Sequence, residues 1–137
     1  MSKKHETISG GWISVNSENL PELLAKLGAG FLVKKAAPRA TQSQMISFDG
    51  MKMRVETNTG FMKKDNVIML DGSQFSGEMF GKQFVATASF DEDGVITVQS
   101  KFPDLDVTSV RKVNEEGQMV LTTTAGDVVC TRNFKRQ

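Results

Sequence analysis

The sequence predicts an all-β protein, an up-and-down antiparallel β-barrel with two short helices inserted after the first strand. Three observations support this fold. From about Gln42 onward, apolar and polar residues alternate with a period of two, as in half-buried strands. Glycine-containing turn pairs, among them Asp49-Gly50, Asp71-Gly72 and Asp93-Gly94, punctuate this region as hairpin turns would. Helical periodicity is confined to a short region near the N-terminus.

The elements are expected in a simple order along the chain. Residues 11–16 form the first strand. A helix then begins at Asn19, its N-cap, and ends at Gly28, because the leucines between them fall on one helical stripe: Leu20, Leu23, Leu24 and Leu27. A second short helix covers residues 31–37. About nine strands follow, and their closure into a barrel removes exposed edges, while the short helices suit a plug at one end.

Length and composition indicate one domain over residues 1–137, with its helical part at about 18–38. The hydrophobic content of 39% suffices for a globular core, and a net charge of +1 argues against a nucleic-acid binder. One cysteine, Cys130, and one histidine, His5, allow no disulfide pair, zinc cluster or Ser-His-Asp arrangement. No signal peptide or membrane span is visible. We therefore expect a cytoplasmic protein without metal, cofactor or catalytic residues, and of the enzymatic chemistries only one based on carboxylates alone stays open.

The last strand places a positive charge on an apolar face, which alternation assigns to Val128, Cys130, Arg132 and Phe134. Arg111 lies on a similar face of an earlier strand. A guanidinium cannot shed its charge, so an inward arginine needs an anion or water beside it. A ligand carboxylate would meet this need, and so would an inner Asp or Glu; the pattern leaves both open. A water-filled cavity would also explain the polar residues on faces expected to point inward: Thr57, Gln99 and Thr123.

Several segments, taken in order, resemble the motifs of one family. The early ones are Gly10-Gly11-Trp12, Ser17-Glu18-Asn19-Leu20 and Leu27-Gly28-Ala29-Gly30-Phe31. Two arginine-bearing strands follow, one around Arg111 and one in the run from Asp127 to Phe134. Over about residues 8–137 the chain resembles the intracellular lipid-binding proteins, the group of fatty-acid-binding and cellular retinoic-acid-binding proteins.

The resemblance implies a ten-stranded β-clam barrel, lidded by the two helices, around a cavity for a long-chain fatty acid. In that family two inward arginines and a tyrosine hydroxyl bind the ligand carboxylate. The arginines correspond to Arg111 and Arg132, and Phe134 stands at the tyrosine position of a chain that has no tyrosine. The residues expected to line the cavity or its portal are Leu20, Leu24, Phe31, Met53, Phe61, Met119 and Leu121.

Arginine at both anchor positions favours a carboxylate ligand, with a long-chain fatty acid as the first choice and retinoic acid as the second. We expect a monomeric, non-enzymatic carrier. Lys34 and Lys35 lie beside apolar residues of the second helix and suit transient contact with anionic membranes, although a solvated helix face is the simpler interpretation. A structural peripheral membrane protein on the same fold is an alternative that the near-neutral charge does not favour.

Overall fold

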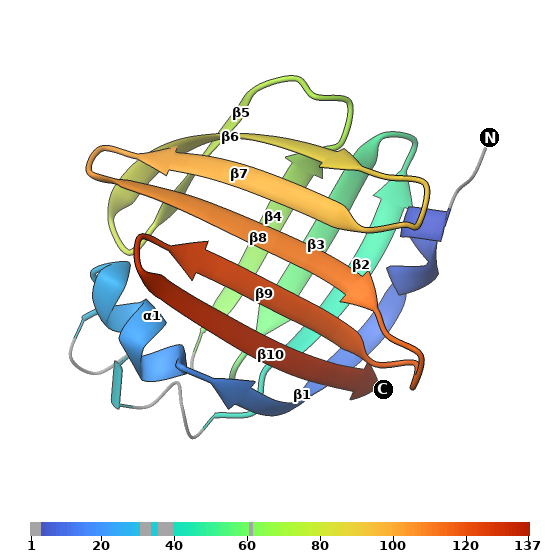
Figure 1. Ribbon diagram of the computed structural model, residues 1–137, viewed down its shortest axis with the longest axis horizontal. Coiled ribbons are helices and arrows are strands. Elements are labelled where there is room, and N and C mark those ends of the chain that lie inside the picture. Colours follow the sequence, from blue (N-terminus) through green and yellow to red (C-terminus); the bar gives the residue numbers. More distant parts are fainter. Residues whose placement is uncertain (1–3, 31–33, 36–39, 61) are drawn as a thin grey trace.

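The computed structural model describes residues 4–30, 34–35, 40–60 and 62–137, and ten antiparallel strands make up most of it (Figure 1). Two helical segments come early, a 3-10 helix η1 (Lys4–Ile8) and an α-helix α1 (Leu20–Lys26). The strands are β1 (Gly10–Glu18), β2 (Ser43–Asp49), β3 (Lys52–Asn58), β4 (Lys63–Met69), β5 (Phe75–Met79), β6 (Lys82–Phe90), β7 (Ile96–Phe102), β8 (Leu105–Val113), β9 (Met119–Ala125) and β10 (Val128–Arg136).

The strands form one curled sheet that closes almost completely into a barrel. Their order is β4-β3-β2-β1-β10-β9-β8-β7-β6-β5, so each strand pairs with a chain neighbour except where β1 joins β10. This arrangement confirms the predicted ten-stranded up-and-down barrel. The sheet ends at β4 and β5, where the Lys64 ammonium donates a hydrogen bond to the backbone carbonyl of Glu78. A side chain therefore bridges the gap that backbone pairing leaves open.

Asp49-Gly50 and Asp93-Gly94 lie in hairpin turns as predicted, whereas Asp71-Gly72 connects β4 to β5, which do not pair. The β6–β7 turn shows how such a sequence directs the chain. The Asp91 carboxylate accepts backbone N–H bonds from Asp93 at 2.9 Å and from Val95 at 3.0 Å. Gly94 then adopts φ of 83°, a left-handed conformation that costs glycine little. Local chemistry thus reverses the chain and sets the register of the paired strands.

Alternation predicts the inner face correctly along most strands. Phe84, Ala86 and Ala88 point inward on β6. The prediction for Gln99 on β7 was wrong, because Gln99 is exposed while Val98 and Ser100 lie on the inner face. A shift of one residue reverses the direction of every side chain on a strand. Ile96, Val98 and Phe102 share the inner face of β7, while Thr97, Gln99 and Lys101 share the outer face, so the alternation within the strand opposes the prediction for Gln99.

Helix α1 covers one end of the barrel and packs against β9 and β10 (Figure 1). Leu20, Leu23 and Leu24 are buried as predicted, and Gly28 follows the helix with φ of 80°. Asn19 occupies the N-cap position as predicted, and its carbonyl accepts from the Leu23 N–H at 3.0 Å. Its backbone is left-handed, with φ of 62°, and its side chain makes no cap bond to the helix. Its amide instead donates to the Val129 carbonyl at 2.9 Å, which ties the helix start to β10.

The predicted second helix falls mostly on residues outside the described part of the chain. Of the residues predicted for this helix, the structure describes Lys34 and Lys35, and both are helical. The Lys34 N–H donates to the Gly30 carbonyl at 3.0 Å. Of the helices in the described ranges, none is long and apolar enough to cross a membrane.

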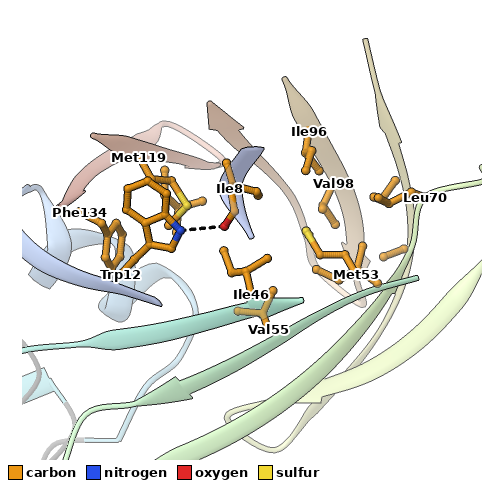
Figure 2. Packing of buried hydrophobic residues seen from close by; sticks show 14 residues of the cluster. Ile8, Trp12, Ile46, Met53, Val55, Leu70, Ile96, Val98, Met119 and Phe134 are labelled. Atoms are coloured by element: carbon orange, nitrogen blue, oxygen red, sulfur yellow. Dashed lines mark hydrogen bonds between the residues drawn. The ribbon is translucent and has the colours of Figure 1, made fainter. Parts of the chain in front are cut away.

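A densely packed group of apolar side chains, here called the base cluster, fills the barrel on the side of η1. Trp12 is completely buried, and its indole N–H donates to the Ile8 carbonyl at 2.8 Å, so that η1 is fixed to β1 (Figure 2). The cluster comprises Ile8, Trp12, Ile46, Met53, Val55, Ile68, Leu70, Ala86, Ala88, Ile96, Val98, Met119, Leu121 and Phe134.

A second group, the lid cluster, packs α1 onto the opposite end of the barrel. It comprises Leu20, Leu23, Leu24, Leu27, Ala29, Val107, Ala125 and Cys130. The two helical segments thus close opposite ends, whereas the sequence suggested a plug at one end only. The 3-10 helix η1 closes the end that the sequence left open, and His5 lies in this helix. His5 is buried, and its ring stacks on Phe90 with 3.7 Å between centroids. The local sequence around His5 is polar, so its burial depends on a partner from β6.

Replacing Gly94 with alanine is expected to destabilise the protein more than the same change at Gly72. Both glycines are left-handed, with φ of 83° and 84°, so either alanine costs about 1–2 kcal/mol in backbone strain. A Cβ on Gly94 would also lie 2.7 Å from the carbonyl carbon of Lys4 in η1, whereas nothing lies within 4 Å at Gly72. We expect this overlap to add about 1–3 kcal/mol to the loss at Gly94. Urea unfolding measures both variants, and equal losses would mean that η1 does not pack on this turn.

Candidate ligand-binding site

A cavity of about 290 Å³ lies inside the barrel and is lined by members of both clusters. Helix α1 contributes three leucines on one side and Leu27 directly follows it, while the strands contribute apolar residues such as Val55, Ile68 and Leu121. Several lining residues are polar or charged: Gln42, Gln44, Thr57, Thr59, Lys64, Asn66, Ser100, Ser109, Arg111, Thr123 and Arg132. The cavity therefore combines apolar walls with a small set of hydrogen-bonding groups, as small-molecule sites do.

Arg111 and Arg132 are positioned by strand register to converge on one region of this cavity. Arg111 on β8 is paired with Leu121 on β9, and Arg132 on β10 is paired with the same Leu121 from the other side. Neighbouring strands are about 4.8 Å apart, so the two arginine backbones are separated by roughly 10 Å. Both side chains line the cavity, and two long side chains at this separation can reach a single small anion.

Arg111 is buried and Arg132 is half-buried, and no described side chain forms an ion pair with either guanidinium group. Arg111 is only 8% exposed, and the Nε atoms of Arg111 and Arg132 are buried and have no hydrogen-bond partner among the described residues. Burial lowers the pKa of Arg111 to about 10 and also lowers the pKa of Arg132. Among the described residues that line the cavity there is no aspartate or glutamate. Among the described cavity residues, no inner aspartate or glutamate therefore pairs with the arginines, which was one of the two alternatives left open by the sequence. The two guanidinium groups are available to an anion.

The aromatic ring of Phe134 contacts the Arg132 side chain. The ring is fully buried, and the guanidinium carbon of Arg132 lies 5.6 Å from the ring centroid. This is a cation–π contact, which favours the charged arginine without consuming any of its N–H donors. Cys130, two residues away on the same face, is a buried free thiol, and burial raises its pKa. The surroundings of Arg132 are therefore neutral.

The structure separates the predicted site residues into three groups. Leu20, Leu24 and Leu121 line the cavity together with the two arginines. Met53 and Met119 are fully buried in the base cluster and do not line it. Phe31 and Phe61 lie outside the described residues.

Some cavity residues were missed by the sequence analysis, notably Gln44 on β2, and Lys64 and Asn66 on β4. The alternation of Lys64, Asn66 and Ile68 on one face of β4 was a usable signal for the last two. Within the described ranges, no group of three or more His, Cys, Asp or Glu side chains is placed to hold a metal ion.

A nearly closed ten-stranded barrel with an interior cationic pair defines a small carrier-like binding protein, and comparisons with known proteins agree. Sodium/calcium exchanger regulatory protein 1 of Doryteuthis pealeii is 32% identical over 132 residues, covering 94% of this chain and 96% of that protein. A fatty acid-binding protein of Clonorchis sinensis is also 32% identical, covering 93% and 96% respectively. No family model matches the chain.

Solved structures give the same result. The REP1-NXSQ fatty acid transporter superposes with a TM-score of 0.87 and 30% identity, covering 95% of this chain and 96% of that one. Relatives at this identity and coverage are decisive for family membership. The chain belongs to the intracellular lipid-binding proteins, the family of fatty-acid-binding and cellular retinoic-acid-binding proteins.

Replacing Arg111 with methionine is expected to stabilise the ligand-free protein. Burial lowers the pKa of Arg111 to about 10, so the charged form destabilises the fold at neutral pH, and this cost diminishes only as the pH rises through about 10. Removing the charge should raise the free energy of unfolding at pH 7 by about 1–3 kcal/mol. Chemical denaturation of delipidated protein measures the change.

The control for this prediction is Arg54→Met. Arg54 is exposed on the outer face of β3 and hydrogen-bonded to Asp65 at 3.0 Å, so its loss should leave stability unchanged or slightly lower. A destabilised Arg111→Met protein would mean that the buried guanidinium has a partner inside the barrel.

Proposed function

We propose that the protein is a non-enzymatic, cytoplasmic carrier of long-chain fatty acids, with the ligand carboxylate held between Arg111 and Arg132. The observation that carries this proposal is the pair of inward guanidinium groups with no described carboxylate beside them. A fatty acid supplies the missing negative charge and an alkyl chain for the leucine-lined walls. The named fatty-acid-binding relatives support the same class of ligand.

The energetics favour an acid over a neutral lipid. Hydrogen bonds to charged groups are each worth about 1.5–3 kcal/mol, and a guanidinium fork matches the two oxygens of a carboxylate. An alcohol offers one neutral oxygen, for which an amide side chain would suffice. Without a tyrosine hydroxyl at Phe134, the anchor depends on the two arginines and loses one neutral hydrogen bond, worth about 0.5–1.5 kcal/mol.

The size of the cavity fits one flexible chain. Its volume of about 290 Å³ lies at the lower end of the roughly 300–1,000 Å³ typical of small-molecule sites. Retinoic acid, which also carries a carboxylate, is the second candidate ligand. Transient membrane contact through the helical lid remains a prediction; Lys34 and Lys35 are exposed and helical. We expect the carrier to be monomeric.

Replacing Arg132 with glutamine is expected to weaken fatty-acid binding far more than binding of the matching alcohol. The variant loses a charge-assisted partner worth about 1.5–3 kcal/mol, which corresponds to roughly a tenfold to hundredfold loss of affinity for the acid. The alcohol can still bond to the glutamine amide. Calorimetric titration of delipidated protein with palmitate and with hexadecanol measures both affinities.

Arg54→Gln on the outer face serves as the matched control for this titration, since it removes an exposed arginine at a distance from the cavity lining. It should bind both ligands as the unaltered protein does. Equal losses for acid and alcohol in Arg132→Gln would remove Arg132 from the anchor.

A further inference from the structure

A second polar region lines the cavity on the half of the barrel opposite the arginines. Gln44 on β2 is paired with Thr57 on β3, and Thr57 is paired with Lys64 on β4. All three line the cavity, and directly paired residues have Cβ atoms about 4.5–5.5 Å apart. They form a continuous polar row, here called the Gln44 row. In Figure 1, β2, β3 and β4 lie behind β8, β9 and β10, so the row and the arginine pair belong to facing halves.

Gln44 is the unsatisfied member of this row. It is only 5% exposed, and its amide nitrogen donates to the Gln42 side-chain oxygen at 3.2 Å. Its own side-chain oxygen, Oε1, is buried and has no hydrogen-bond partner within the part of the chain that the structure describes. A buried acceptor without a donor is costly, so a ligand that brings a donor to this point gains affinity over one that does not.

The neighbours of Gln44 in this row supply hydrogen-bond donors. The Lys64 ammonium has three donors, one of which is used on the Glu78 carbonyl. Thr57 adds a hydroxyl that can donate or accept. The row therefore presents an unpaired acceptor beside donors, and the group that complements it must both donate and accept. A hydroxyl does this, whereas a second carboxylate would only accept and would oppose the Gln44 oxygen.

We propose that the cavity selects fatty acids that carry a hydroxyl group on the alkyl chain. This inference rests on the proposed function, because the carboxylate must first be held by Arg111 and Arg132. The ligand hydroxyl donates to Gln44 Oε1 and accepts from Thr57 or Lys64. A plain alkyl chain at the same place leaves the Gln44 oxygen unpaired and brings CH₂ groups against polar side chains.

The test compares stearate with a series of stearates that carry one hydroxyl at different chain positions, by competition against a fluorescent fatty acid on delipidated protein. At least one hydroxylated isomer should bind about three- to tenfold more tightly than stearate, as one or two additional hydrogen bonds predict. Gln44→Met and Thr57→Val keep side-chain size while removing hydrogen-bonding groups, and either should bring this affinity ratio close to one.

The matched control is Thr87→Val, the same substitution on the exposed face of β6, which should keep the ratio of the unaltered protein. If stearate binds and depends on Arg132 while no isomer binds more tightly, the hydroxyl selectivity is wrong and the carrier function stands. A preference that persists in both row variants would overturn the assignment to the Gln44 row. If no acid binds at all, the carrier function and this inference both fail.

Discussion

The unpaired positive charge of Arg111 and Arg132 inside the barrel is the constraint on which the rest of the structure depends. A guanidinium keeps its charge at any physiological pH, and burying it alone is unfavourable. The interior around these arginines therefore cannot be a dry apolar core. It is a cavity with threonine and serine in its walls, and Arg132 is stabilised by the Phe134 ring instead of a carboxylate. Under the proposed function, a bound carboxylate supplies the missing negative charge, so the feature that weakens the empty protein would give affinity for an acidic ligand.

The two apolar clusters stabilise the fold around this unfavourable interior. The base cluster fills the barrel beside η1, where Trp12 is completely buried and bonded to the Ile8 carbonyl. The lid cluster attaches α1 to β9 and β10, and the Asn19 amide reinforces that contact through the Val129 carbonyl. Because these two ends carry the packing, the cavity that both clusters line can contain polar side chains. The apolar residues that line the cavity therefore also belong to the packing that stabilises the fold.

Much of this organisation could be predicted from the sequence, and the exceptions have physical reasons. Arg132 was predicted on the inner face because β10 has one clearly apolar face. The prediction for Gln99 took the wrong face of β7, where Ile96, Val98 and Phe102 mark the opposite face as the apolar one. Asparagine is a residue type that often caps helices through its side chain, but the Asn19 side-chain amide instead donates to the Val129 carbonyl on β10. The burial of His5 depends on Phe48 and Phe90, which are distant in sequence. The polar row at Gln44 was not predicted because it arises only when three strands are aligned in register.

The pKa of a bound fatty acid tests most directly whether Arg111 and Arg132 hold its carboxylate. Nuclear magnetic resonance of palmitate with an isotope-labelled carboxyl carbon reports its protonation state in the complex as the pH is lowered. If Arg111 and Arg132 hold the carboxylate inside the barrel, the bound acid should stay ionised well below the pKa of about 4–5 of an ordinary carboxyl group. A bound carboxyl group that titrates at or above that value would lie in solvent or in an apolar site, and would contradict the account.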